Sequence, residues 1–190
     1  MYMHSNEENI PYGFSDSDHA GDHSDSKSTS GHFFLSGGAT VWASKKQSVV
    51  AKSTAEAELN ALSLAASSAA WMRLFLAQIG LPMANPLEIK CDNQAAIAVS
   101  TGGDRPHKLL KHMQIHYHYA QDLETEGEIS VVYVPTKDNL ADQFTKSLPK
   151  DQVKLQSSAL GLYPTANVLP VLHSSSIDPS LSLYEDAVDQ

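Results

Sequence analysis

Four carboxylates in this chain of 190 residues stand where short elements of secondary structure are expected to begin or end. Asp16 closes a strand-like segment, and Asp92 directly follows another. Glu58 and Asp142 each lie near the start of a segment with helical character. In a mixed α/β chain such positions meet at one edge of the sheet, where functional sites assemble. Because carboxylate oxygens are the ligands that Mg²⁺ prefers, a divalent-metal site is one interpretation of this placement.

Three of these acids also have a purely structural interpretation. Asp16 precedes a stretch rich in Asp, Ser and Gly, where an aspartate often stabilises a turn. Asp92 stands before a predicted helix and is a candidate N-cap, and the helix dipole would favour Asp142 in a first turn. The residue types alone leave both interpretations open.

Glu56 and Glu58 compete for the same place in the predicted site. Two residues apart on a helix, their side chains point about 200° apart. Glu58 continues an apolar stripe, so we expect it to point into the body of the protein, where a buried carboxylate needs a cation or a hydrogen-bond donor. Glu56 continues a polar stripe, and we expect it to face solvent as a capping residue with Ser53. The apolar stripe is Leu62, Ala65, Ala69, Met72 and Leu76; the polar stripe is Asn60, Ser63 and Ser67.

The elements that must position these acids follow from periodicity and turn signals. The order strand-strand-strand-helix-strand-helix-helix-strand-helix predicts an α/β fold with a mixed five-stranded sheet, three antiparallel strands followed by two further strands, flanked by helices. Gly37-Gly38 marks a hairpin between the second and third strands. The expected strands are 12–16, 32–35, 39–44, 87–91 and 129–134, and the expected helices are 53–78, 93–100, 109–125 and 139–148.

The domain organisation follows from where this pattern begins and ends. We expect an N-terminal extension at 1–10, one domain at 11–149, and a C-terminal tail at 150–190 that is partly ordered at best. The single cysteine, Cys91, excludes an internal disulfide and fits a reducing compartment. No apolar run reaches the roughly 18 residues of a membrane span, and no secretory signal is present, so neither a membrane partner nor secretion is expected.

The charge pattern leaves room for a nucleic-acid partner despite a net charge of −9. Both ends of the chain are acidic, whereas residues 27–112 hold nine Lys and Arg against five Asp and Glu. A basic middle between acidic ends permits a phosphate-binding face.

Eight short blocks, in order along about 12–149, resemble the ribonuclease H domain of copia-type LTR-retrotransposon Pol polyproteins. Each block alone is a weak signal, and the ordered set is specific. The blocks are GFSDSD at 13–18, KSTSG at 27–31, SKKQS at 44–48, STAEAE at 53–58, CDNQAAI at 91–97, KH at 111–112, YVPT at 133–136 and NLADQFTK at 139–146.

The resemblance implies a ribonuclease H-like fold and metal-dependent endonucleolytic hydrolysis of the RNA strand of RNA–DNA hybrids during reverse transcription. It places Asp16, Glu58, Asp92 and Asp142 at the catalytic, metal-binding positions, with two Mg²⁺ ions per site and Mn²⁺ expected to substitute. The implied partners are the hybrid and a reverse transcriptase domain N-terminal in the polyprotein. The implied location is the cytoplasm, in a virus-like particle, or the nucleus.

A hybrid-binding surface is predicted from hydroxyl, amide and lysine side chains, which can meet phosphate and 2′-OH groups. Solvated turns and strand ends explain most of these residues equally well. The candidates are Ser28, Thr29, Ser30, Lys45, Lys46, Gln47, Asn93 and Gln94.

Two other functions remain open from the sequence. One is a catalytically silent, nucleic-acid-binding remnant of a retrotransposon polyprotein. The other is a zinc-binding module built on His112, His116 and His118, whose helical spacing can bind zinc.

Overall fold

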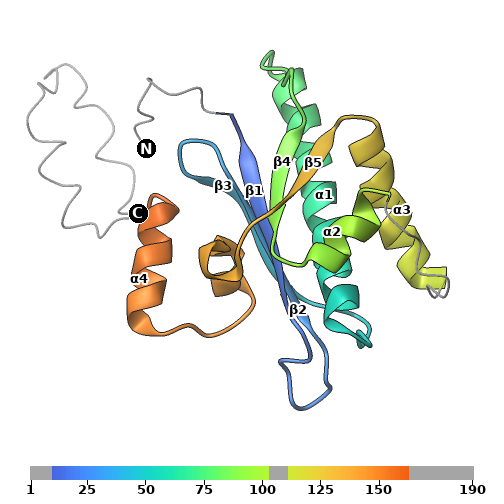
Figure 1. The fold of residues 1–190 in the computed structure, drawn as a ribbon. Coiled ribbons are helices and arrows are strands. Elements are labelled where there is room, and N and C mark those ends of the chain that lie inside the picture. Colours follow the sequence, from blue (N-terminus) through green and yellow to red (C-terminus); the bar gives the residue numbers. More distant parts are fainter. Residues whose placement is uncertain (1–9, 103–110, 163–190) are drawn as a thin grey trace, which may run out of the picture.

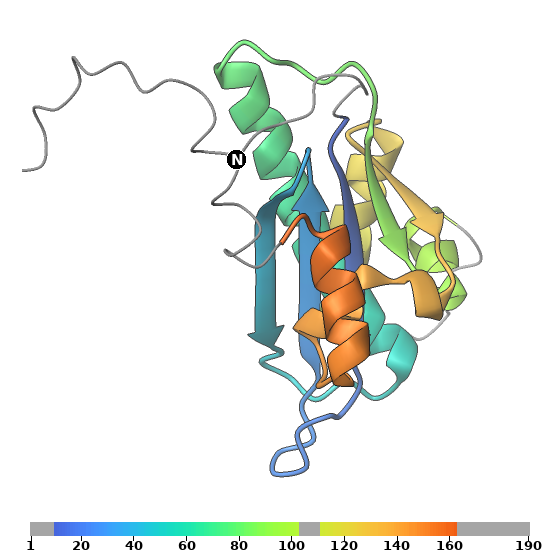
Figure 2. The same cartoon turned by 90° about the vertical axis from the view of Figure 1, so that its left-hand side faces the viewer.

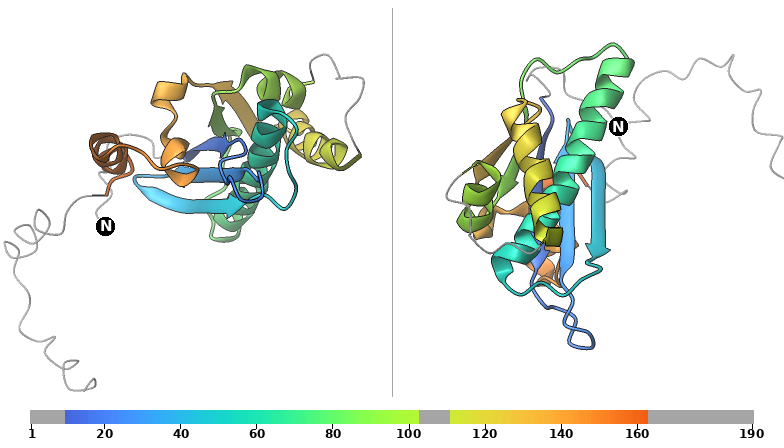
Figure 3. Two further views of the ribbon diagram at one scale, coloured as in Figure 1. Left: turned by 90° about the horizontal axis from the view of Figure 1, so that it is seen from below. Right: turned by 90° about the vertical axis from the view of Figure 1, so that its right-hand side faces the viewer.

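The computed structural model describes residues 10–102 and 111–162, with the side chains of 111–117 left out. A five-stranded sheet lies between two layers, with α1, α2 and α3 over one face and two short turns and α4 over the other (Figures 1 and 3). The mixed five-stranded sheet and its three antiparallel strands are as expected from the sequence. The structure adds the sheet order, β3-β2-β1-β4-β5, and shows that the last two strands run parallel to β1. The strands are β1 (Tyr12–Asp18), β2 (Thr29–Leu35), β3 (Ala39–Lys46), β4 (Leu87–Cys91) and β5 (Ile129–Tyr133).

The first three strands form the predicted meander, and each is slightly longer than its sequence signal. Gly37 has a φ of 69° in the β2–β3 hairpin, a conformation that glycine adopts without steric cost. β1 and β4 run parallel, so their carboxyl ends lie at the same edge of the sheet (Figure 1). That edge carries Asp16 and Asp92.

The helices are α1 (Thr54–Gln78), α2 (Gln94–Ser100), α3 (Lys111–Thr125) and α4 (Lys150–Ala159). Ser53 caps α1, because its hydroxyl accepts a hydrogen bond from the backbone N–H of Glu56 at 3.1 Å. The N-terminus of α1 lies at the sheet edge just described (Figure 1). The main core lies between α1 and the sheet and contains Phe34, Leu62, Ala65, Ala66, Ala69, Met72, Leu87, Ile89, Cys91, Ala120, Ile129 and Val131.

The opposite face of the sheet carries a second, smaller core beneath the last part of the described chain. Alternation along β1 places Phe14 and Asp16 on this face, and Phe14 belongs to the second core. A Cβ at Gly31 would lie 2.7 Å from the Thr145 side chain and 2.8 Å from that of Phe144, so the missing side chain lets this segment lie directly on β2. Figure 2 shows α4 over this face.

One predicted element is wrong in type. The helix expected at 139–148 is replaced by two 3-10 turns, η1 (Thr136–Asp138) and η2 (Leu140–Phe144). Asn139 joins the two turns, and its side chain hydrogen-bonds to β1 as well as to η2, which fixes an irregular path instead of a continuous helix. α4 follows Pro149, inside the segment predicted as a tail. No helix among the described residues is long and apolar enough to cross a membrane.

Candidate metal centre

Asp16 lies inside β1, which continues to Asp18 before the next loop begins. It is therefore not a turn residue. Its side chain is 3% exposed, and one carboxylate oxygen accepts a hydrogen bond from the hydroxyl of Thr145. Burial raises the pKa of Asp16 to about 6, against the opposing effect of the Thr145 hydrogen bond, and the charges of Asp142 and Asp92 add to the rise.

Glu58 reaches the same edge from the first turns of α1, over the other face of the sheet. Its Oε1 accepts a hydrogen bond from the backbone N–H of Ser17 at 3.2 Å. Its Oε2 is buried without a hydrogen-bond partner, in a residue that is only 6% exposed. Burial, followed by the negative charges of Asp16 and Asp92, raises the pKa of Glu58 to about 8. The predicted inward orientation of Glu58 is thus observed.

Asp92 directly follows β4 and is half-buried. It does not cap α2, because the side chain of Asn93 does so by accepting a hydrogen bond from the N–H of Ala96 at 3.0 Å. One oxygen each of Glu58 and Asp92, together with Sγ of Cys91, lie within 4.8 Å of one another. Burial raises the pKa of the Cys91 thiol far above its ordinary range, so this side chain remains a protonated core residue.

Asp142 comes from η2 and completes the group of four acids, called here the carboxylate cluster (Asp16, Glu58, Asp92 and Asp142). It is 4% exposed, and its charge acts on Asp16 across the gap between η2 and β1. Because η2 is a single 3-10 turn, a helix dipole does not account for this acid. Lys146 pairs with it, with 2.8 Å between Lys146 Nζ and Asp142 Oδ1.

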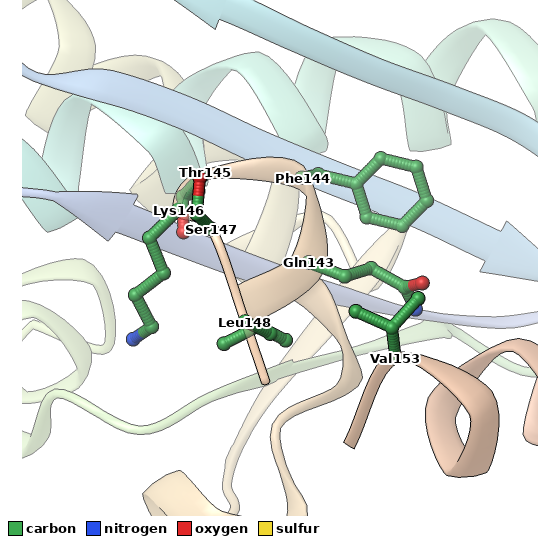
Figure 4. A pocket seen from close by; sticks show the side chains of 7 residues that line it. All are labelled: Gln143, Phe144, Thr145, Lys146, Ser147, Leu148 and Val153. Carbon is green, nitrogen blue, oxygen red and sulfur yellow. The ribbon is translucent and has the colours of Figure 1, made fainter. Parts of the chain in front are cut away.

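An open depression of about 530 Å³ lies where η2 runs toward α4 (Figure 4). The side chain of Lys146 extends away from the Phe144 and Val153 side of this depression (Figure 4). Burial acts to lower the pKa of Lys146, but pairing with Asp142 and the charges of Asp16 and Asp92 hold that pKa above its ordinary value. The ammonium group is thus attracted by the charges of three members of the carboxylate cluster.

The cluster has the features of a divalent-cation site. Four acids from β1, α1, the end of β4 and η2 meet at one sheet edge, and two of them are costly to ionise without a positive partner. The unpartnered Oε2 of Glu58 is a buried acceptor that a metal ion would satisfy. All-carboxylate oxygen ligands match the preference of Mg²⁺ and Mn²⁺. The residues present therefore fit a divalent metal ion.

Glu56 differs from its predicted environment. Its carboxylate accepts a hydrogen bond from the backbone N–H of Lys52, at 2.7 Å, one residue before the N-cap Ser53 whose N–H the capping box was expected to use. It does not face solvent, since it is only 3% exposed. The chain before α1 folds over it, with Ala51 itself buried. The solvent exposure predicted for Glu56 from the polar stripe is therefore wrong, and Asn60 and Ser63 of the same stripe are also buried.

The predicted nucleic-acid-binding residues fall into two groups. Lys45, Lys46 and Gln94 are exposed, Thr29 and Asn93 are half-buried, and Lys46 forms ion pairs with Asp22 and Asp25. The other candidates, Ser28, Ser30 and Gln47, are buried. The Gln47 amide group donates to Ser30 Oγ and to the Ala57 carbonyl, both at 2.9 Å, and accepts from Asn60 at 3.2 Å. These bonds tie the end of β3 to α1.

The histidine-based zinc site lies largely outside the described residues. The side chains of His112 and His116 fall in the part of α3 that is left out, and His118 is exposed. The zinc interpretation therefore stays a prediction.

Sequence reasoning assigned no role to Asn139, Thr145 or Lys146, although all three lie in one recognised block, 139–146. Asn139 is fully buried; its Nδ2 donates to the carbonyl of Ser15 at 3.0 Å, and its Oδ1 accepts from the N–H of Ala141 at 3.1 Å. Thr145 donates to Asp16. Asn139 and Thr145 therefore join η2 to β1 on both sides of Asp142. The available signal was an amide residue directly before the apolar pair Leu140 and Ala141.

We expect Asn139→Ala to lower the free energy of unfolding by about 2–4 kcal/mol, because it leaves a buried carbonyl and a buried N–H without partners. The urea midpoint measures this loss. Asp138→Ala, at the exposed neighbouring position, is the control and should stay within about 0.5 kcal/mol of the wild type. Equal midpoints for the two variants would show that the Asn139 bonds do not hold η2 on β1.

Comparison with known proteins shows sequence similarity between the chain and retrotransposon Pol polyproteins. No family model matches it. It is 34% identical over 152 residues to the retrovirus-related Pol polyprotein from transposon TNT 1-94 of Nicotiana tabacum, covering 80% of this chain and 11% of that protein. The identity to the Pol polyprotein from transposon RE1 of Arabidopsis thaliana is also 34% over 152 residues, covering 80% and 10%. The chain spans about a tenth of the length of these curated relatives.

Solved structures share the architecture at low sequence identity. RNase H1 from Halobacterium salinarum matches with a TM-score of 0.51 and 19% identity, covering 71% of this chain and 93% of that chain. LC11-RNase H1 in complex with an RNA/DNA hybrid matches with 0.54 and 14%, covering 71% and 93%. A foamy viral protease-reverse transcriptase in complex with RNA/DNA hybrid matches with 0.51 and 18%, covering 73% and 20%. At these identities the likeness concerns the fold.

Proposed function

We propose that this chain, which is homologous to a segment of the Pol polyproteins of copia-type retrotransposons and has the ribonuclease H fold, cleaves the RNA strand of RNA–DNA hybrids in a metal-dependent reaction. The main observation in support is the carboxylate cluster, in which four acids from separate elements converge at one sheet edge. The buried Oε2 of Glu58, which has no hydrogen-bond partner, gives the strongest support for cation binding by the cluster.

Bound divalent ions would supply a nucleophile from water at neutral pH and neutralise the attacking and leaving oxygens of a phosphodiester. The chain's own residues prepare that chemistry by holding the ligands in place. Thr145 orients Asp16, the N–H of Ser17 orients Glu58, and Asn139 anchors the turn that carries Asp142. Asp92 is the most exposed member of the cluster, so an incoming phosphate would reach it from solvent.

The proposed hybrid-binding face continues from the cluster along the ends of β2 and β3. Strand register pairs Thr29 with Lys46 and Ser30 with Lys45, and Ser17 of β1 with Ser30, so these residues share the edge that carries Asp16. Lys45 and Lys46 would meet phosphates, and Thr29 and Gln94 would meet sugar hydroxyls. Three of the candidates, Ser28, Ser30 and Gln47, are buried and would support this face from beneath without contacting the hybrid.

We propose further that the chain acts beside a reverse transcriptase domain located N-terminal to it in a polyprotein, within a virus-like particle in the cytoplasm or in the nucleus. Homology to one segment of much longer Pol polyproteins supports the polyprotein context of this proposal. The fold likeness to part of a foamy viral protease-reverse transcriptase is consistent with it.

The test is incubation of the chain with an RNA–DNA hybrid labelled on the RNA strand, with Mg²⁺, with Mn²⁺ and with EDTA. RNA–RNA and DNA–DNA duplexes of the same sequence are the controls. We expect cleavage of the hybrid RNA with either metal and none with EDTA. Cleavage that persists in EDTA, or that is equal on all duplexes, contradicts the proposal. Hybrid binding without cleavage favours the silent, nucleic-acid-binding alternative.

A further inference from the structure

Lys146 places a positive charge directly against the carboxylate cluster. Its Nζ lies 2.8 Å from Oδ1 of Asp142, four residues earlier, and the Asp142 side chain is only 6% exposed. An exposed ion pair contributes little to stability, but a cation beside a buried carboxylate offsets a much larger desolvation cost. This pair belongs to the second kind, because the carboxylate is enclosed, whereas the lysine side chain is 38% exposed.

The backbone holds Lys146 in this position. Its N–H donates to the carbonyl of Asp142 at 3.1 Å, so the turn after η2 brings the lysine back over the acid. Thr145, the preceding residue, is fixed by its hydrogen bond to Asp16. Among the residues that the structure describes, no other lysine or arginine forms an ion pair with a member of the carboxylate cluster.

We propose that Lys146 is an internal cation of the carboxylate cluster that holds Asp142 in the metal-free protein and competes with a divalent ion for it. The inference rests on the proposed function, because it takes the cluster as the divalent-metal site. Its consequence is a weaker affinity for divalent ions than four acids alone would give, since a bound metal ion and the ammonium group repel each other at one carboxylate. The lysine therefore sets the concentration of divalent ion at which the site fills.

A structural role alone predicts a different result. If Lys146 only stabilised η2, its removal would loosen the turn, misplace Asp142 and weaken metal binding. Competition predicts the opposite sign, because removal leaves Asp142 free to bind the divalent ion. The sign of the change in affinity therefore separates the two roles.

The experiment measures Mg²⁺ binding to the full chain by isothermal titration calorimetry, without nucleic acid. The variants are Lys146→Met, Lys146→Arg, which keeps the charge, and Lys137→Met, which removes an exposed lysine from η1. We expect Lys146→Met to lower the dissociation constant roughly three- to tenfold. Lys146→Arg and Lys137→Met should remain within about twofold of the wild type.

Thermal unfolding gives a second readout. In EDTA, Lys146→Met should melt below the wild type, because Asp142 loses the ammonium group that pairs with it, and saturating Mg²⁺ should shrink or reverse that difference. Equal or weaker Mg²⁺ binding by Lys146→Met overturns the inference, as does the absence of binding by every variant. Neither result bears on whether hybrid cleavage requires a metal, which the EDTA experiment decides separately.

Discussion

Asp92→Asn is expected to abolish hybrid cleavage while the protein keeps its fold. The substitution preserves the shape of the side chain and removes one charge from the carboxylate cluster. Asp92 neither caps α2 nor lies in the core, so the fold does not depend on it. Metal-assisted charge stabilisation contributes several kcal/mol to such reactions, which corresponds to a loss of activity of roughly 100-fold or more.

The measurement is the initial rate of cleavage of a labelled RNA–DNA hybrid at saturating Mg²⁺, with the urea midpoint recorded on the same preparation. Asp122→Asn, at an exposed position on α3, is the matched control and should cleave at the wild-type rate. A wild-type rate for Asp92→Asn would remove this residue from the active centre. A variant with a much lower midpoint would instead assign Asp92 a structural role.

The five strands and their sequence along the chain could be predicted because local signals agree with the fold in this part of the chain. Alternation, β-branched residues and the Gly37-Gly38 turn each favoured the observed strands, and the cap at Ser53 marked the start of α1. The region after β5 could not be predicted in the same way. Its conformation depends on the side chain of Asn139 hydrogen-bonding across 124 residues to Ser15, and no local pattern carries that contact.

In the candidate site, too, local sequence signals predicted some features, while others depend on tertiary contacts. Residue type and position suggested the four acids, and helical geometry gave the orientation of Glu58. The contacts that hold the acids were not foreseen, because Thr145, Lys146 and Asn139 act through tertiary proximity. Burial was misjudged where polar residues satisfy one another: Gln47 and Glu56 both read as surface residues, and both are enclosed by hydrogen-bonded partners. Sequence polarity predicts a need for hydrogen bonds, which solvent or protein can meet.

Glu58→Gln is expected to abolish cleavage and, in EDTA, to stabilise the protein at alkaline pH. Burial, Asp16 and Asp92 raise the pKa of Glu58 from 4.5 to about 8, so the folded state binds a proton that the unfolded state releases between these values. The metal-free wild type must therefore lose stability as pH rises from about 4.5 to 8. Glutamine does not titrate in this range, so the variant should lack the part of the stability loss that Glu58 causes.

Glu56→Gln is the matched control, since it makes the same change two residues away on α1, at a similarly buried carboxylate that hydrogen-bonds to the backbone before the helix. It should cleave normally and retain the wild-type dependence of stability on pH. Glu56→Ala, which also removes the cap, should lower the free energy of unfolding by about 0.5–2 kcal/mol with cleavage nearly unchanged. The three variants thus separate the charge at the site from the cap at the helix start.

Urea midpoints in EDTA at pH 5 and pH 8, with cleavage rates at pH 8 in Mg²⁺, measure both effects. Relative to the wild type, Glu58→Gln should gain roughly 2–4 kcal/mol between the two pH values. Saturating Mg²⁺ should stabilise the wild type at pH 8 and the variant much less, because the variant lacks the carboxylate that the ion would neutralise. If Glu56→Gln were inactive and Glu58→Gln active, the metal-binding acid of α1 would be Glu56. If neither changed the pH dependence, the buried Oε2 of Glu58 would already have a partner in solution, and the argument for a cation at this edge would lose its strongest support.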